Sequence, residues 1–172
     1  GLALDAGTLR LLEDASLDDS LGDAQLGHTL PVLEGLSHLV YVAEAARQER
    51  PISGLELETQ AEVDKFAICL LHRWKSAKKA FEPLLDRLYY RFETAPMSDD
   101  LRQRYEQANR TALGFSRSLR DHVHAGSIGD FRQALRRFWN KAGWHVGRIR
   151  FNLRQGGRNK PVPNVVYKTR RS

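Results

Sequence analysis

The sequence predicts an all-α protein, built as two small helical bundles or as one bundle of five to six helices, with an extended C-terminal arm. Apolar residues recur at intervals of three and four along most of the chain, and glycine and proline divide it into segments of helical length. The apolar content of 41% and charged content of 28% are ordinary for a globular protein. No apolar run approaches the roughly 18 residues of a membrane span, so we expect no membrane partner and a cytoplasmic location.

Four helices are expected in the first half of the chain: residues 5–14, Pro31 to about Gln48, 56–80 and, after an interruption at Pro83, 84–92. In the second, helical spacing predicts a buried stripe of Leu33, Leu36, Val40 and Ala43, and in the third the same period runs through Phe66, Leu70, Trp74 and Ala77. Cys69 is the only cysteine, which excludes an internal disulfide, and we expect it in the core.

The best-defined helix begins after Ser98, whose hydroxyl is a typical cap, followed by Asp99 and Asp100 at the positive end of the helix dipole. It is expected to run as far as Gly126, a natural stop. One face is apolar and predicted to be buried: Leu101, Tyr105, Ala108, Ala112, Phe115, Leu119 and Val123. Another face carries Arg102, Arg110, Arg117 and Arg120.

A last helix is expected over residues 129–142, with Phe131, Leu135 and Phe138 inward and Arg132, Arg136, Arg137 and Lys141 outward. Beyond Gly143 the spacing of Val146, Ile149 and Leu153 favours helix over a strand. We expect an arm from residue 156 that orders on a partner. The predicted organisation is an acidic lobe at 1–95, a basic lobe at 96–155 and a basic arm at 156–172.

Charge is distributed very unevenly along the chain. Residues 1–66 carry thirteen acidic and four basic side chains, whereas residues 67–172 have a net charge of +15. Residues 131–172 contain twelve Lys or Arg and no Asp or Glu. This segregation predicts a polyanionic partner for the C-terminal half and allows a protein partner for the acidic half.

Arginine binds phosphate through paired, charge-assisted hydrogen bonds, and a row of arginines on a helix can follow a nucleic-acid backbone without reading its sequence. Trp139 lies about 80° from the apolar face and is a candidate for stacking on unpaired bases. The predicted contacts to single-stranded DNA or RNA are Arg102, Arg110, Arg117, Arg120, Arg132, Arg136, Arg137, Trp139, Lys141, Arg148, Arg150 and Arg154. Phosphate-binding loops, nucleophile elbows and paired catalytic carboxylates are missing from the sequence, so we expect no catalytic residue and no cofactor.

Two alternatives concern histidines near Gly126. Arg117 and His122, with four residues between them, resemble the motif of the higher eukaryote and prokaryote nucleotide-binding ribonucleases, in which histidine would act as acid or base and arginine would hold the phosphate. The two side chains point about 140° apart on a straight helix, which is awkward for one site. His122, His124 and His145 match no spacing of zinc ligands, so no metal site is expected.

The order of features resembles the small subunit of type I-E CRISPR Cascade complexes over most of residues 5–154. The matching elements are Thr8-Leu9-Arg10, Pro31-Val32-Leu33, Leu119-Arg120 leading to His124-Ala125-Gly126, and Asp130-Phe131 followed by Leu135, Phe138 and Trp139. The resemblance implies two helical bundles without catalytic activity, which contact other subunits of a ribonucleoprotein, a second copy among them, and steady the guide-paired target or the displaced strand. Phe131 departs from the tryptophan expected there. An accessory scaffold subunit of a ribosome or other large assembly is the remaining alternative.

Overall fold

The computed structural model describes residues 21–90 and 98–149, with side chains to residue 140. Its elements are α3 (Leu26–Arg47), α4 (Gly54–His72), the 3₁₀ turn η1 (Trp74–Ser76), α5 (Ala77–Leu85), the π-helical turn η2 (Asp86–Tyr90), α6 (Asp99–Ser118), α7 (Arg120–His124) and α8 (Ile128–Ile149). These two ranges contain helices and no strand, which confirms the all-α prediction. The predicted helix at 5–14 and the arm at 156–172 lie outside them.

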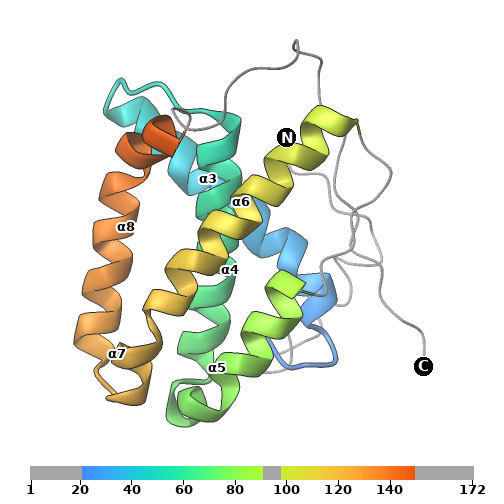
Figure 1. The fold of residues 1–172 in the computed structure, drawn as a ribbon, viewed down its shortest axis with the longest axis vertical. Coiled ribbons are helices and arrows are strands. Elements are labelled where there is room, and N and C mark those ends of the chain that lie inside the picture. The colour runs from blue at the N-terminus through green and yellow to red at the C-terminus, as the bar shows by residue number, and fades with distance from the viewer. Residues whose placement is uncertain (1–20, 91–97, 150–172) are drawn as a thin grey trace.

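The helix α4 is the centre of the fold, because α3, α5, α6 and α8 all pack against it (Figure 1). Figure 1 shows α6 crossing α4 obliquely and α8 running back beside it. Phe66 on α4 contacts Phe81 on α5, with ring centroids 5.5 Å apart. The core also includes Leu119 and Phe131, so the acidic and basic lobes predicted from the sequence contribute side chains to the same core.

The prediction for the first described helix was wrong in two respects. α3 begins at Leu26, more than a turn before Pro31, because Leu26 and Leu30 are buried in the core and hold the extra turn. The predicted buried stripe is instead exposed at Leu36 and Val40, which are 48% and 55% accessible. The buried face of α3 is turned by about 90° from the predicted stripe and includes Ser37 and Tyr41. Leu33, from the predicted stripe, packs partly buried against the core.

This buried face is polar because α4 presents matching polar groups. Tyr41 donates a 2.6 Å hydrogen bond to Glu56, which also pairs with Arg50. Farther along, the buried Lys65 ammonium lies 3.0 Å from a Glu34 oxygen and 2.7 Å from a Glu62 oxygen. Paired charges of this kind can be withdrawn from water when their hydrogen bonds are complete.

Asp64 gives the α3–α4 contact a pH dependence. Ser37 donates a 2.6 Å hydrogen bond and Gln60 a 2.8 Å hydrogen bond to its carboxylate, yet burial dominates and raises the pKa of Asp64. A raised pKa in the folded state contributes stability below the unfolded value, and this contribution is lost as pH rises through the folded pKa.

We therefore expect Asp64→Asn to gain stability relative to wild type as the pH is raised from 4 to 7. The measurement is the difference in urea unfolding free energy between the two proteins at each pH. Glu49→Gln, at an exposed acid just after α3, is the control. A difference for Asp64→Asn that does not change with pH would contradict the assignment.

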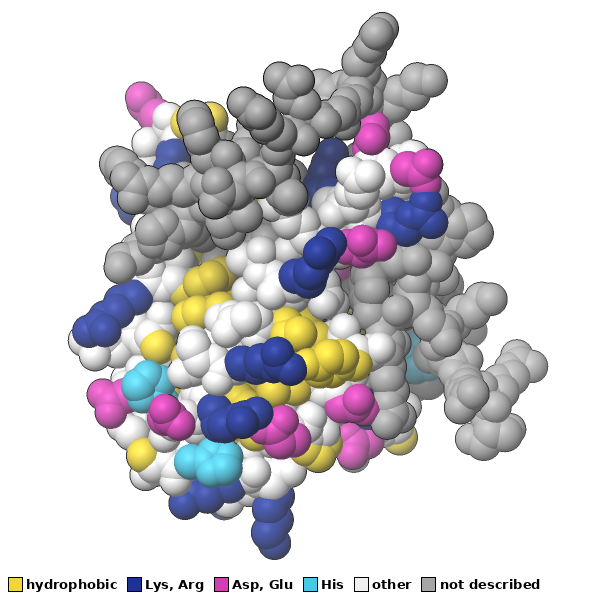
Figure 2. All heavy atoms as spheres, in the orientation of Figure 1, with side chains coloured by type: hydrophobic (Ala, Val, Ile, Leu, Met, Phe, Trp, Pro, Cys, Tyr) yellow, Lys and Arg dark blue, Asp and Glu magenta, His cyan; other side chains and the backbone are white. Residues whose placement is uncertain are grey.

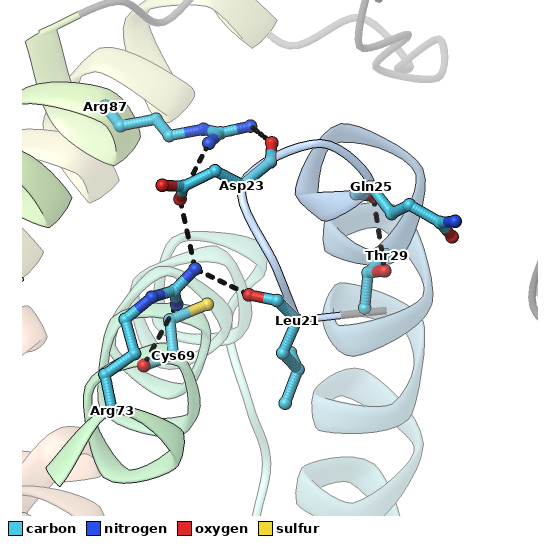
Figure 3. A network of polar contacts seen from close by, with 7 residues as sticks. All are labelled: Leu21, Asp23, Gln25, Thr29, Cys69, Arg73 and Arg87. Atoms are coloured by element: carbon cyan, nitrogen blue, oxygen red, sulfur yellow. Dashed lines mark hydrogen bonds and ion pairs between the residues drawn. The ribbon is translucent and has the colours of Figure 1, made fainter. Parts of the chain in front are cut away.

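The helix predicted over 56–80 is broken at Arg73 into α4, η1 and α5. The Arg73 guanidinium turns to the segment before α3, donating 2.6 Å and 3.1 Å hydrogen bonds to the Leu21 carbonyl and the Asp23 carboxylate (Figure 3). Arg87 binds the same aspartate. Pro83 does not interrupt a helix as expected but lies inside α5, where it lacks only the hydrogen bond to the fourth residue before it.

The predicted apolar face of the next helix is confirmed, with Leu101, Tyr105 and Ala112 buried. The helix nevertheless pauses at Leu119 before α7, and Gly126 ends α7 with a positive φ of 70°, which glycine adopts without strain. The Ser98 hydroxyl makes no capping hydrogen bond. Helix is confirmed beyond Gly143, since α8 continues to Ile149.

Cys69 is buried as expected. Burial raises the pKa of its thiol to about 11, so it is not ionised at neutral pH. No helix in the described part of the chain is long and apolar enough to cross a bilayer.

Candidate nucleic-acid interface

The four predicted arginines of α6 and α7 are exposed, and each has a partner. Arg102 pairs with Asp99, and Arg110 lies 3.6 Å from Glu106, so both pairs are within one turn of the same helix. Arg120 lies 2.7 Å from Glu82 on α5. Exposed ion pairs of this kind contribute about 0–1 kcal/mol to stability. A phosphate that binds one of these arginines would therefore displace only a weakly held carboxylate.

Arg117 has an aromatic partner instead of a carboxylate. Its guanidinium donates a hydrogen bond to the Tyr90 hydroxyl and lies 5.7 Å from the centre of the Tyr90 ring. Arg120 likewise lies over the Phe81 ring, at 5.9 Å. Both contacts orient the guanidiniums against aromatic rings of α5 and η2, and both arginines remain exposed.

The three predicted arginines in the first half of α8 are free of such partners. Arg132, Arg136 and Arg137 are exposed, and their guanidiniums form no ion pair or hydrogen bond with the described residues 21–90 and 98–140. The inner face of α8 is fixed by aromatic contacts: Phe131 lies 5.2 Å from Trp74, and Phe138 stacks on Phe115 at 4.1 Å. The packing of this face leaves the arginines directed to solvent.

A second group of free cations was missed from the sequence. Lys75, Lys78 and Lys79, on η1 and α5, are exposed and have no ion-pair partner in the described ranges. Their spacing of three and four residues is a signal that could have revealed them, since it places them on one face of a helix. The apolar period of residues 56–80 predicts only the buried face of the helix and does not single out these lysines.

The lysines and the α8 arginines come from neighbouring elements. Trp74 precedes Lys75 and Phe131 precedes Arg132, and the contact between these two rings joins η1 to the start of α8. We call the six side chains the basic end: Lys75, Lys78, Lys79, Arg132, Arg136 and Arg137. Figure 2 shows Lys, Arg and His side chains at the lower end of the molecule, where Figure 1 places α5 and α7, with acidic side chains among them.

Trp139 is half-buried and has an aromatic neighbour of its own. Its ring meets Tyr41 edge to face, with centroids 4.9 Å apart. The two rings, with Arg50 and Asn140, are among the residues that line a small pocket of about 100 Å³. Stacking of Trp139 on a base stays a prediction. The contact with Tyr41 fixes the orientation that the indole ring would have in such stacking.

The remaining predicted contacts lie at or beyond the end of the described side chains. Lys141 and Arg148 belong to α8, but their side chains are not described. Arg150 and Arg154 lie outside the described residues. The described part of the candidate interface therefore consists of the basic end and the partnered arginines of α6 and α7.

The structure gives Arg117 and His122 no mutual contact in the described part of the chain. Arg117 is bound to Tyr90, and Leu119 interrupts the helix between the two residues. His122 and His124 are on the short helix α7, and the side chain of His145 is not described. The ribonuclease alternative gains no geometric support from these positions.

Comparison of the chain with protein-family models, with curated proteins and with solved structures finds no match. Function is therefore inferred from the geometry of the surface itself.

Proposed function

We propose that this protein is a non-catalytic, sequence-independent nucleic-acid-binding subunit of a nucleoprotein complex. The observation that carries the proposal is the basic end, where six exposed cations lack a carboxylate partner within the described residues. A cation without an internal partner can bind phosphate without first breaking an ion pair, and each such contact releases a counterion from the nucleic acid. These cations stand on helices of the core, and the contact between Trp74 and Phe131 joins the two elements that carry Lys75 and Arg132.

The order of elements that resembles the Cascade small subunit supports a place beside other subunits in such a complex. The exposed apolar side chains of α3 agree with a protein neighbour, since Leu39 is 66% accessible and Leu36 and Val40 are exposed beside it. In this role the basic end would hold a guide-paired target or a displaced single strand by its phosphates. The chain would contribute affinity without base recognition.

We expect binding to single strands to weaken steeply with salt. If each of the six cations contacts one phosphate, the logarithm of the association constant should fall with the logarithm of salt concentration with a slope of about −4, which is a loss of roughly 300-fold between 50 and 200 mM. Fluorescence anisotropy with labelled DNA and RNA oligomers of mixed sequence measures this slope. Further contacts from the basic arm would make it steeper.

A flat salt response would rule out phosphate binding by this surface. Strong preference for one base sequence would contradict a backbone-directed role. The same labelled RNA should remain intact during incubation, and cleavage that His122→Ala abolishes would replace this proposal with the ribonuclease alternative.

A further inference from the structure

Three side chains with metal-binding groups converge between α3 and α4, on residues that the interface does not use. Glu34 and His38 are four residues apart on α3 and therefore lie on one face of the helix, and Glu58 faces them from α4. One ligand atom from each lies within 4.8 Å of the other two. The side chains are 14%, 25% and 12% accessible, which separates them from ordinary surface carboxylates.

The imidazole of His38 is the unusual member of this group. Its Nε2 atom is buried and has no hydrogen-bond partner in the part of the chain that the structure describes. The nearest carboxylate atom, Oε2 of Glu58, is 3.5 Å away, which is too long for a good hydrogen bond. Buried polar atoms without a partner are rare in folded proteins, and an ion is one explanation for them.

The 3.5 Å separation suits two ligands of one metal ion. Nitrogen and oxygen ligands about 2.0–2.1 Å from a tetrahedral zinc ion are about 3.3–3.4 Å apart. A ligand oxygen of Glu34 lies within 4.8 Å of both of these atoms and supplies a third ligand. The Lys65 ammonium, 3.0 Å from the Oε2 atom of Glu34, holds this side chain beside the other two ligands.

Acidic side chains beside this site also favour a cation. Glu62 on α4 is a further carboxylate near Glu34, and the Lys65 ammonium lies 3.0 Å from a Glu34 oxygen and 2.7 Å from a Glu62 oxygen. A divalent cation would be attracted by this group of carboxylates.

We propose that Glu34, His38 and Glu58 form a binding site for a divalent transition-metal ion of the zinc type, with one coordination position left for water. One imidazole and two carboxylates suit Zn²⁺ or Co²⁺, whereas Mg²⁺ and Ca²⁺ prefer oxygen ligands alone. The ion would join α3 to α4 next to the Lys65 ion pairs. Its binding would therefore stabilise the folded chain.

The test uses the full chain after removal of metal with a chelator, titrated with ZnCl₂ or CoCl₂ while thermal unfolding and Co²⁺ visible absorption are recorded. We expect the Tm to rise with Zn²⁺ concentration and to respond much less to MgCl₂. His38→Gln and Glu58→Gln should each weaken Zn²⁺ binding about tenfold or more. His124→Gln, which removes an exposed histidine from α7, should bind Zn²⁺ as wild type does.

Three results would overturn the site: no Tm response of wild type to Zn²⁺, an equal response in His38→Gln, or loss of the response in His124→Gln alone. If His38→Gln does not fold, Glu58→Gln and the wild-type Co²⁺ spectrum decide the matter. A spectrum of hexaaqua Co²⁺, unchanged by the protein, would mean that no site exists.

Discussion

Replacing Lys65 with alanine should lower the free energy of unfolding by about 3–5 kcal/mol. Its side chain is 2% accessible and lies between Glu34 and Glu62, so alanine leaves two carboxylates withdrawn from water without their cation. Burial already raises the pKa of Glu62, and Lys65 is the largest opposing influence. Chemical denaturation at pH 7 measures the loss.

Most of this loss in stability comes from burying carboxylates without a cation, and little of it from the net stabilisation that the ion pairs provide. The triple variant Glu34→Gln, Glu62→Gln, Lys65→Met should therefore recover most of the lost stability, because it removes all three charges and keeps the volume of the side chains. Lys78→Ala, on the exposed face of α5, should change stability by less than about 0.5 kcal/mol. A loss in unfolding free energy below about 1 kcal/mol for Lys65→Ala would mean that water reaches the carboxylates of Glu34 and Glu62.

Removal of the three free arginines of α8 should have the largest effect on nucleic-acid binding. In Arg132→Gln, Arg136→Gln, Arg137→Gln the salt slope on single strands should become about 2 units less steep, which corresponds to a loss of about 100-fold in affinity at 0.1 M salt. Helical content and Tm should stay close to wild type, because all three side chains are exposed. Anisotropy and circular dichroism measure these quantities.

A matched variant with three charges removed from α6 tests the position of the interface. Arg102→Gln, Arg110→Gln, Arg117→Gln should reduce binding less, since these guanidiniums already have Asp99, Glu106 and Tyr90 as partners. An equal or greater loss in the α6 variant would move the interface from the basic end to α6.

The sequence was most reliable where one face of a helix was apolar and the other charged. The buried face of α6 and the exposure of its arginines followed from spacing alone, since burial of the apolar stripe leaves the guanidiniums in water. Spacing failed for α3, whose buried face carries Ser37, Glu34 and Tyr41. A polar residue can be buried when another helix supplies a hydrogen-bonding or charged partner for it. The spacing of apolar residues along one helix contains no information about that partner.

For the candidate sites as well, one part can be predicted from the sequence and another part depends on the tertiary structure. The sequence alone contains the twelve cations of residues 131–172, with no acidic residue among them, and therefore predicts a polyanionic partner. Which arginines are free and which are paired depends on neighbours brought close by folding, such as Glu82 beside Arg120. The cluster of Glu34, His38 and Glu58 is likewise a product of folding, because Glu58 is twenty residues from His38 in the chain and only the packing of α4 on α3 brings their atoms to 3.5 Å.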